Sequence, residues 1–461
     1  MLTKKLNIHF IGIGGIGVSA LARYYLEKGY QVSGSDLVSS EITQALKKKG
    51  AKIFVGKHRG KNLPKDTDLI IYSPAVQQNN PELKEATYRG LTPVSYPQAL
   101  GELTKKHFTI AVCGSHGKST VAAMIGVLLK KAGFNPTVIV GTKVKEFGDS
   151  NCRVGNSKYL VIEADEHFAS FLNYWPKIIV LTNIEADHLD YYKNLKNILK
   201  NFKKFVSHLP ENGILVANKD DKNIRLLNSK FKSQKSKLQF KIQNYSIKEK
   251  EAGKLRKILK IPGEFNISNA LAALTVARVL KISDRISFKA LSEYRGSWRR
   301  FDITKILYPK PYTLISDYAH HPTQIKVTLE AAREKYLYPP KFSKKKFRRA
   351  RRKIWCIFQP HQYQRTYYLW NDFVKVLSEA PVDKLIITDI YDVAGREEKE
   401  IKQKVNSEKL IKAIEKPWAI YLPKKKIVNY LNRNLQGGEV VIVMGAGDIY
   451  ELSLKFKGRI K

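Results

Sequence analysis

The stretch HFTIAVCGSHGKST at residues 107–120 constrains the fold of this chain more than any other part of the sequence. An apolar run leads into two glycines, Gly114 and Gly117, and a helical pattern then extends to residue 133. A strand that passes through such a loop into a helix is a building unit of a parallel α/β sheet. The usual phosphate-binding loop has one more glycine, at the position of Val112 here. We therefore predict a shortened loop that still binds a nucleoside triphosphate.

The chemistry of this loop follows from its residue types. In such loops the backbone N–H groups converge on phosphate oxygens at the N-terminus of the helix. Lys118 would add positive charge near the β- and γ-phosphates, and the hydroxyl of Ser119 or Thr120 would reach a magnesium ion. We expect the nucleotide site to include Gly114, Ser115, His116, Gly117, Lys118, Ser119 and Thr120.

Strand-like and helical patterns alternate along the chain, which predicts an α/β fold with parallel sheets. They form three series with breaks near residues 104 and 297. Strands are expected within 6–14, 30–36 and 67–76, then within 107–114, 159–166 and 177–192, and finally within 312–322, 353–361, 384–391 and 439–448. Convincing helices are expected at 266–280 and 323–336. The chain is too long for one hydrophobic core, so three α/β units are the economical interpretation.

Two lysine-rich segments interrupt this alternation. The segment 225–260 lacks strong periodicity, and we expect small strands or insertions there. The segment KFSKKKFRRARRK at 341–353 is expected to be a basic insertion in a surface connection, with no assigned role.

A second glycine-rich loop lies near the start of the chain. Gly12, Gly14, Gly15 and Gly17 follow an expected strand and precede an expected helix, and Asp36 lies further along. In this context the pattern satisfies the dinucleotide fingerprint, in which glycines admit a pyrophosphate and the acid meets a ribose. A tight turn without a ligand is the alternative. The pattern indicates a diphosphate but not which nucleotide carries it.

Acidic and polar clusters follow several of the expected strands. In a parallel sheet these strand ends share the edge where the phosphate-binding loop lies, and acids there can hold Mg²⁺ beside phosphates. The acidic clusters are Glu163-Ala-Asp165-Glu166 and Asn183-Ile-Glu185-Ala-Asp187-His188. Two clusters in the last third, Asp317-Tyr318-Ala319-His320-His321 and Gln359-Pro360-His361 with Arg365, suggest a further ligand site on one rim.

The formal net charge of +41 would ordinarily suggest a nucleic-acid partner. The lysines and arginines are spread along the chain without an aromatic-interleaved RNA pattern, so we expect no nucleic acid and favour a general compositional bias.

Three scattered cysteines do not suggest disulfides and fit a reducing cytoplasm. The apolar N-terminal run is glycine-rich, which favours a folded strand over a signal peptide. No uncharged stretch reaches the ~18 residues needed to cross a bilayer.

Taken in order, several motifs resemble those of the Mur ligases, ATP-dependent amide-forming enzymes of peptidoglycan precursor synthesis. The resemblance covers nearly the whole chain and rests on HFIGIGGIGVSALA, GSHGKST, EADE, TNIEADHLDYY, NISNALAA, RRF, DYAHHPTQI, FQPHQYQRT and MGAGDI. It is strongest to the members that join L-alanine to UDP-N-acetylmuramic acid. It implies a Rossmann-like UDP-sugar domain at 1–104, a central ATP-binding P-loop domain with a mixed sheet at 105–297, and a Rossmann-like α/β amino-acid domain at 298–461.

The implied reaction transfers the γ-phosphoryl group of ATP to the muramoyl carboxylate, and the amine of L-alanine then attacks the acyl phosphate. By resemblance, Lys118 would meet the β- and γ-phosphates, Arg299 or Arg300 would approach the γ-phosphate, and Ser119, Glu166 and His188 would hold Mg²⁺. Asn266 and Asn269 would meet the adenine and Asp317 the ribose. The UDP-sugar would be bound by Gly12, Gly14, Gly15, Gly17, Asp36 and Ser73, and the acceptor side would be lined by His320, His321, His361 and Arg365, with Arg365 facing the carboxylate of L-alanine.

The chain departs from the family pattern at two places. The family usually has Glu-Ser-Asp where this chain has Glu166-His167-Phe168, and a histidine in place of Phe265, which could still stack on adenine. A ligase that attaches a murein tripeptide to the same UDP-sugar is the nearest alternative. A folate polyglutamylating enzyme would lack the first glycine loop, an NAD-dependent dehydrogenase would leave GSHGKST unexplained, and an RNA-binding NTPase would show nucleic-acid-stimulated hydrolysis.

Overall fold

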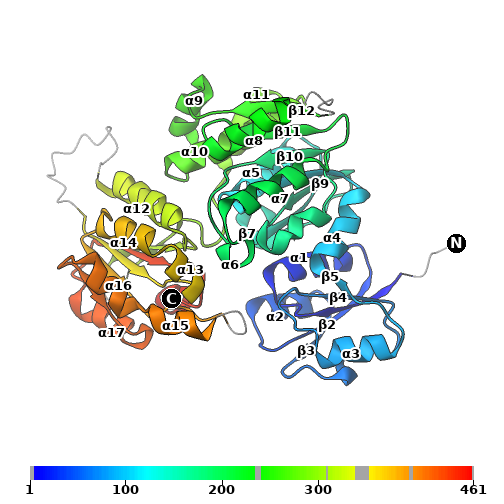
Figure 1. The fold of residues 1–461 in the computed structure, drawn as a ribbon, viewed down its shortest axis with the longest axis horizontal. Helices are drawn as coiled ribbons and strands as arrows, with labels where there is room; N and C mark the ends of the chain where they lie inside the picture. The colour runs from blue at the N-terminus through cyan, green and yellow to red at the C-terminus, as the bar shows by residue number, and fades with distance from the viewer. Residues whose placement is uncertain (1–4, 234–239, 308–309, 338–351, 394–397, 459–461) are drawn as a thin grey trace. The chain divides into compact units, whose positions relative to one another are not determined.

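The computed structural model describes residues 5–233, 240–307, 310–337, 352–393 and 398–458. The chain forms two compact units, which can be followed by their labels in Figure 1. The first unit comprises residues 1–184, 198–255 and 269–294, and the second comprises 185–197, 256–268 and 295–461. The expected basic insertion at 341–353 lies almost entirely outside the described residues.

The first unit begins with a five-stranded parallel sheet. Its order is β3-β2-β1-β4-β5, so the chain adds strands on one side of β1 and then continues on the other side. A ligand crevice is expected where the direction reverses, beyond the carboxyl ends of β1 and β4. The strands are β1 (Asn7–Ile11), β2 (Gln31–Asp36), β3 (Lys52–Val55), β4 (Leu69–Tyr72) and β5 (Val94–Ser95), and the helices are α1 (Ile16–Glu27), α2 (Glu41–Lys48), η1 (Gly60–Asn62), α3 (Pro81–Tyr88) and α4 (Tyr96–Lys105).

The second sheet of this unit has seven strands in the order β12-β11-β10-β6-β9-β7-β8. All neighbours are parallel except β7 and β8, so the sheet is mixed, as expected. Its strands are β6 (Phe108–Cys113), β7 (Thr137–Val144), β8 (Ser150–Arg153), β9 (Tyr159–Glu163), β10 (Ile178–Leu181), β11 (Ile214–Asn218) and β12 (Lys241–Tyr245). Because β6 pairs with both β9 and β10, the residues that follow these three strands meet at one edge.

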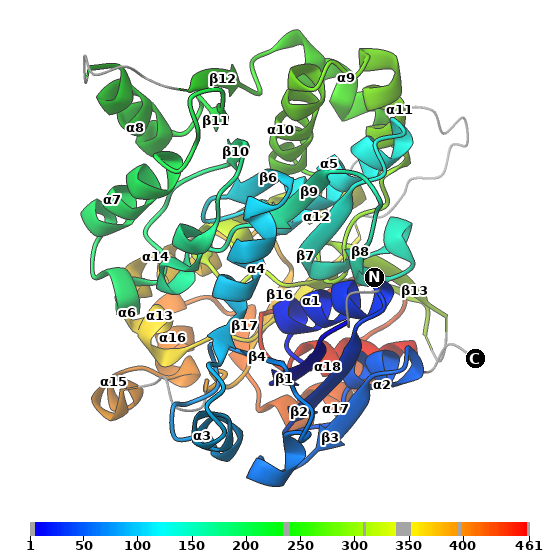
Figure 2. The same cartoon turned by 90° about the vertical axis from the view of Figure 1, so that its right-hand side faces the viewer.

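Helices and short 3₁₀ segments connect these strands. They are α5 (Lys118–Lys131), η2 (Lys145–Phe147), η3 (His167–Asn173), α6 (Leu189–Tyr192), α7 (Leu195–Val206), α8 (Lys222–Ser233), α9 (Lys250–Ile258), α10 (Glu264–Val279) and α11 (Asp284–Glu293). The helix α1 of the first sheet packs against β7 and β8 of the second, as Figure 2 shows. The amide Nδ2 of Asn151 in β8 donates to the hydroxyl of Ser19 in α1, at 2.9 Å.

The second unit contains a six-stranded sheet in the order β13-β14-β18-β15-β16-β17, in which only β13 is antiparallel. Its strands are β13 (Asp302–Ile306), β14 (Tyr312–Asp317), β15 (Ile354–Phe358), β16 (Lys384–Ile387), β17 (Ala419–Tyr421) and β18 (Val440–Met444). Its helices are α12 (Pro322–Leu337), α13 (Tyr363–Tyr368), α14 (Trp370–Ser378), α15 (Lys399–Lys404), α16 (Ser407–Ile414), α17 (Lys424–Asn434) and α18 (Tyr450–Lys457). Asp317 and Phe358 both pair with Met444, so three strands end side by side.

The cores follow from the sequence pattern of the strands. Runs such as Ile354–Phe358 and Val440–Met444 are apolar at every position and buried at every position, which is typical of parallel strands covered on both faces. The segment 225–260 is more regular than expected, because α8, β12 and α9 account for most of its described residues. None of the described helices combines the length and apolarity needed to cross a membrane.

Candidate active site

The phosphate-binding loop connects β6 to α5 and depends on two glycines with positive φ. Gly114 has φ +133°, and Gly117, which caps α5, has φ +84°. A Cβ on Gly114 would lie 2.1 Å from a threonine hydroxyl that follows β10, so only glycine fits there. The loop is also held from the side: the N–H of Ser115 donates to the carbonyl oxygen of Asn183 at 3.0 Å, and the N–H of His116 donates to its Oδ1 at 2.8 Å. The loop is therefore shaped before any ligand arrives.

Lys118 begins α5, and oxygen atoms surround its ammonium group. Its Nζ lies 2.8 Å from Oε2 of Glu166, 2.9 Å from the carbonyl oxygen of Gly114 and 3.6 Å from Oδ1 of Asp165. Only 11% of the lysine side chain and 3% of the Glu166 side chain are exposed. Burial alone would lower the pKa of Lys118, but the negative charges of Glu166, Asp165 and Glu163 outweigh it and raise that pKa. Lys118 is thus held as a cation.

Ser119 contacts a different carboxylate. Its hydroxyl lies 2.9 Å from Oε1 and 2.8 Å from Oε2 of Glu163, the last residue of β9, and the N–H of Gly141 also donates to Oε2 at 2.8 Å. The sequence-based prediction assigns the metal to Ser119, Glu166 and His188. In the structure Glu166 contacts Lys118, and Glu163 contacts the hydroxyl of Ser119. Thr120, also buried, lies in the same first turn of α5.

The two asparagines expected at the adenine lie one turn apart on α10. Asn269 borders the phosphate-binding loop, because a Cβ on Gly117 would lie 2.5 Å from its Oδ1. Asn266 is buried in the second unit, and its Nδ2 donates to the carbonyl oxygen of Pro262 at 2.7 Å. Phe265, whose ring could stack on adenine, packs against the hydrophobic core of the six-stranded sheet.

The first glycine loop lies at the reversal point of the five-stranded sheet. Gly12 has φ +77°, and its N–H donates to the carbonyl oxygen of Ser35 at 2.9 Å. Ser73 directly follows β4, and its Cβ would lie 3.0 Å from a Cβ on Gly12. Gly12 and Ser73 are therefore in contact where a ligand crevice is expected. Gly15 is the N-cap residue of α1.

Asp36 and Gly17 have partners that the fingerprint alone does not specify. The Oδ2 of Asp36 accepts a hydrogen bond from the N–H of Gly14 at 2.8 Å, so the carboxylate expected at a ribose binds the loop itself. A Cβ on Gly17 would lie 2.9 Å from Cζ of Tyr96, the first residue of α4. In the fingerprint the third glycine makes room for packing, and here a tyrosine ring uses that room.

Arg299 and Arg300 have different surroundings. The Arg299 guanidinium donates to carbonyl oxygens of the loop after β18 and lies 4.8 Å from the ring of Tyr318 and 4.7 Å from that of Tyr450. Only 5% of Arg299 is exposed, and this burial lowers its pKa to about 10. Arg300 is half-buried, and its guanidinium lies 4.9 Å from the Tyr318 ring. Of the two, Arg300 has the more accessible guanidinium.

Asp317 ends β14 with both carboxylate oxygens engaged. Its Oδ2 accepts from the N–H of Phe301 at 2.7 Å and its Oδ1 from the N–H of Ala319 at 2.8 Å. Burial raises the pKa of Asp317, although Arg300 acts against that shift. The residue expected at the ribose therefore also fixes the turn that carries His320 and His321.

Arg365 in α13 forms a buried ion pair with Asp187. Its Nη2 lies 3.1 Å and its Nε 3.2 Å from Oδ1 of Asp187, and both side chains are 6% exposed. Burial would raise the pKa of Asp187, but Arg365 foremost and His188 hold it well below its usual range. The adjoining cavity, which Arg365 and Tyr368 help to line, measures about 10 Å³, which is room for about one water. Arg365 can face the carboxylate of L-alanine only if this pair rearranges.

His320 and His361 lie beside this pair. The rings of the two histidines are 5.8 Å apart, and His361 stacks on Tyr391 with centroids 5.4 Å apart. The Nδ1 of His361 lies 3.3 Å from Nη1 of Arg365. Burial, reinforced by the charge of Arg365, lowers the pKa of His320 well below its usual range. Its Nδ1 lies 3.1 Å from the carbonyl oxygen of Tyr318, so Nδ1 carries the proton and Nε2 the lone pair.

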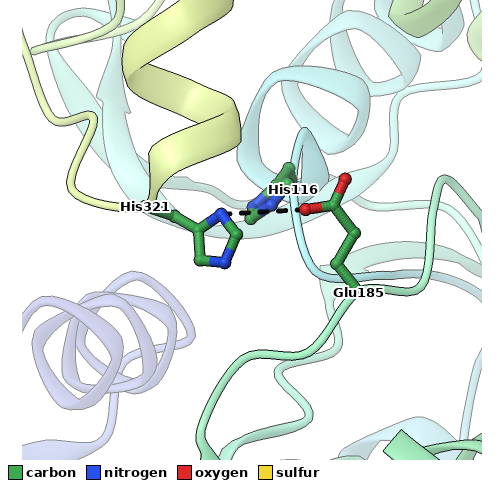
Figure 3. Close-up of side chains that lie close together, drawn as sticks. All are labelled: His116, Glu185 and His321. Atoms are coloured by element: carbon green, nitrogen blue, oxygen red, sulfur yellow. Dashed lines mark ion pairs between the residues drawn. The ribbon is translucent and has the colours of Figure 1, made fainter. Parts of the chain in front are cut away.

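His321 and His188 accompany acids of the segment after β10. Figure 3 shows His321 facing Glu185, with Nδ1 3.7 Å from Oε2 of the carboxylate. Thr323 also donates its hydroxyl to Glu185, at 2.7 Å. His188 caps α6 in a left-handed conformation, and its N–H donates to Oδ1 of Asp187 at 2.7 Å.

Three residues that position the site were not assigned individual contacts from the sequence. Asn183 holds the phosphate-binding loop, Glu163 holds Ser119, and Asp187 holds Arg365. The sequence indicated them only by their places at or after the ends of buried strands. Side-chain direction at a strand end depends on the following turn, which a residue pattern does not specify.

Comparison with protein families gives three matches that follow one another along the chain. They are "Mur ligase family, catalytic domain" at residues 7–108, "Mur ligase middle domain" at 112–277 and "Mur ligase, glutamate ligase domain" at 299–447. The chain belongs to the Mur ligase family. This confirms the resemblance that the motifs indicated, and the three-domain α/β fold agrees with it.

Individual Mur ligases are similar over nearly the full length. A UDP-N-acetylmuramate–L-alanine ligase of Acetivibrio thermocellus is 39% identical over 472 residues, covering 98% of this chain and 96% of the relative. One of Caldanaerobacter subterraneus is 39% identical over 483 residues, covering 99% and 98%. The crystal structure of the UDP-N-acetylmuramate–alanine ligase of Thermotoga maritima has a TM-score of 0.76 at 27% identity and covers 99% of both chains. A murein peptide ligase of Psychrobacter arcticus, 21% identical with a TM-score of 0.70 over 99% and 98%, shares the fold.

Proposed function

We propose that this Mur ligase is an ATP-dependent enzyme that joins L-alanine to the carboxylate of UDP-N-acetylmuramic acid through an acyl phosphate, in peptidoglycan precursor synthesis. The observation that carries the proposal is the presence, in one compact unit, of a glycine loop at a sheet reversal point and a phosphate-binding loop with Lys118. The two full-length relatives described above carry the name of this activity, which supports the choice of substrates.

The phosphate-binding loop fits a bound nucleotide. Gly114 and Gly117 allow a tight loop in which a Cβ would collide with Thr182 or Asn269, and Lys118 is held as a cation beside them. ATP supplies the phosphoryl group that turns a poor electrophile, the carboxylate, into a reactive one. We assign the phosphates to residues 114–120, the adenine to Asn266 and Asn269, and the ribose to Asp317.

The metal would be Mg²⁺, for which carboxylate and hydroxyl oxygens are suitable ligands. We assign it to Ser119, Glu166 and His188, and we add Glu163 because its carboxylate already contacts the Ser119 hydroxyl. Bound Mg²⁺ would supply charge compensation for the phosphates. The loop with Gly12, Gly14, Gly15 and Gly17, together with Asp36 and Ser73, would bind the UDP moiety of the sugar substrate.

The second unit would bind L-alanine, whose amine attacks the acyl phosphate. Arg300, with its accessible guanidinium, is the better of the two arginines for a phosphoryl oxygen, and Arg365 would face the carboxylate of L-alanine. The acceptor site would also include His321 and His361. His320 is neutral with a lone pair on Nε2, so it can accept a hydrogen bond from the amine of L-alanine and orient it. We assign it no role as a general base, because its lowered pKa makes the imidazole a weak base.

One assay tests this function. The enzyme is given ATP, Mg²⁺ and UDP-N-acetylmuramic acid with either L-alanine or the murein tripeptide, and phosphate release and product mass are measured. We expect phosphate release that requires both the UDP-sugar and L-alanine, with a product heavier than the sugar by one alanyl residue. Phosphate release without the UDP-sugar would contradict the proposal, and preference for the tripeptide would establish the alternative ligase. We expect the reaction in the cytoplasm, where ATP and the nucleotide sugar are available.

A further inference from the structure

The segment after the acidic end of β9 contains two neighbouring residues with left-handed backbone. Phe168 has φ 51° and ψ 28°, and Ala169 has φ 53° and ψ 27°. For a residue with a bulky side chain this conformation is unfavourable, and it persists only where the surroundings impose it. Such residues are concentrated at ligand sites.

The segment is fixed on both sides of these two residues. On one side, Glu166 binds Lys118, and its carbonyl oxygen accepts from the N–H of Ala169 at 2.8 Å. On the other side, Phe171 is fully buried and stacks on Phe205, with centroids 4.7 Å apart. Because both ends are fixed, the left-handed turn directs the Phe168 ring outward, and 43% of the residue is exposed. The ring is stacked on His167, with centroids 4.1 Å apart and planes 25° apart.

The helix α4 contacts both the segment that carries Phe168 and the first glycine loop. Gly101 lies against the carbonyl oxygen of Asn173, and the N–H of Trp175 donates to the Thr104 hydroxyl at 3.0 Å. The helix α4, which begins at Tyr96 against Gly17, therefore packs against η3. Burial raises the pKa of Tyr96, and the negative charges of Glu163 and Asp165 add to this shift, so this tyrosine lies near the acidic end of β9.

We propose that Phe168, with Tyr96 beside it, forms an aromatic platform for the hexosamine ring of the UDP-sugar and is a specificity-determining residue. This rests on the proposed function. The diphosphate of the substrate would lie at Gly12–Gly17, and its carboxylate must reach the phosphoryl group at Lys118. Tyr96 packs against Gly17, and Phe168 lies two residues after Glu166, which binds Lys118. A sugar that connects the two sites would therefore pass these rings, and the C–H face of a pyranose packs well on an aromatic face.

The test separates a ring that binds sugar from a ring that only supports the fold. In Phe168→Gly the platform is removed and the strained backbone is relaxed, because glycine adopts positive φ readily. Ala169→Gly relaxes the neighbouring residue and keeps the ring, so it is the matched control. Phe168→Tyr keeps a ring of nearly the same shape and serves as the rescue variant. Steady-state KM and kcat are measured for UDP-N-acetylmuramic acid and ATP, with thermal unfolding midpoints for all variants.

We expect the KM for UDP-N-acetylmuramic acid to rise about threefold to tenfold in Phe168→Gly, the range for loss of one aromatic contact. The KM for ATP should stay within about twofold of the wild-type value, because the lost contact is to the sugar and not to the nucleotide. Ala169→Gly and Phe168→Tyr should resemble the wild type. Inhibition by uridine diphosphate, which has no sugar ring, should be the same in all four proteins.

Three results would overturn this inference and leave the proposed function intact. They are an unchanged KM for the UDP-sugar in Phe168→Gly, an equal rise of the KM values for ATP and the UDP-sugar, and loss of inhibition by uridine diphosphate in that variant. The last result would mean that the ring acts on the glycine loop. If the wild-type enzyme releases phosphate without regard to the UDP-sugar, the proposed function fails, and the platform fails with it.

Discussion

The ammonium of Lys118 lies 2.8 Å from the carboxylate of Glu166, and both side chains are largely shielded from solvent. The residue that should bind the phosphates of ATP is therefore already neutralised by an acid. Phosphate binding requires Lys118 to exchange this partner or share it, and Glu166 then becomes available for a cation. We therefore expect this pair to couple nucleotide binding to metal binding.

Removing this lysine should affect stability as well as activity. We expect Lys118→Met to abolish phosphate release and to lower the free energy of unfolding by about 3–5 kcal/mol, because Glu166 is left as an uncompensated buried charge. The double variant Lys118→Met/Glu166→Gln should regain most of that stability without regaining activity. Chemical unfolding and the phosphate assay measure the two effects. Equal instability of the single and double variants would show that the pair is not the cause.

The two acids near the loop should differ in their effect on the metal. The Ser119 hydroxyl contacts Glu163, so we expect Glu163→Gln to raise the Mg²⁺ concentration for half-maximal activity about tenfold, the usual order for weakening a metal site. Glu166→Gln should change this concentration less and alter the KM for ATP, because it frees Lys118. Titration of each variant with Mg²⁺ at saturating ATP measures the difference. The reverse order would make Glu166 the principal metal ligand.

The sequence was sufficient for an α/β fold with parallel sheets and for the places of the main loops, because buried parallel strands and glycine loops leave strong patterns. It did not indicate which acid meets which partner. Glu163 and Glu166 are equivalent as residue types, and only the turn after β9 directs one to Ser119 and the other to Lys118. The helices in 225–260 were missed because their few buried positions, such as Ala252 and Leu255 in α9, are outnumbered by lysines.

Arg299 and Arg300 are adjacent but should give opposite phenotypes. Arg299 is buried between aromatic rings and binds backbone carbonyls, so Arg299→Met should lower the thermal unfolding midpoint by several degrees, since about 1–3 kcal/mol is lost when buried acceptors lose their donor. Arg300→Met should leave the midpoint unchanged and reduce kcat at least about 100-fold, as expected for a group that stabilises transferred phosphoryl charge. Scanning calorimetry and the phosphate assay distinguish the two. A stable, inactive Arg299→Met would reverse the assignment.

The Asp187–Arg365 pair should set the affinity for the amino acid. If Arg365 must leave Asp187 to meet the carboxylate of L-alanine, Asp187→Asn should lower the KM for L-alanine. Arg365→Lys should raise it about tenfold, because lysine does not reproduce the two-point geometry of a guanidinium. The KM for ATP should not change in either variant, which serves as the internal control. Parallel changes of both KM values would mean that the pair only supports the fold.

His320 should make the second unit sensitive to mild acid. Burial and Arg365 hold the pKa of this imidazole well below the usual value near 6.5, so the folded protein keeps it neutral. The unfolded chain binds a proton as the pH falls below about 6.5, so unfolding becomes more favourable there, by up to about 1.4 kcal/mol per pH unit. The stability is fully present above that pH and is lost as the pH falls toward the depressed pKa.

The variant His320→Asn cannot bind this proton, so its stability should depend less on pH. We expect the difference between the unfolding midpoints at pH 7.5 and pH 5.5 to be smaller in the variant than in the wild type. The same variant should raise the KM for L-alanine, because the lone pair on Nε2 of His320 would no longer orient the amine. An unchanged pH dependence of stability would contradict the buried neutral histidine, and an unchanged KM for L-alanine would exclude its contact with the amine.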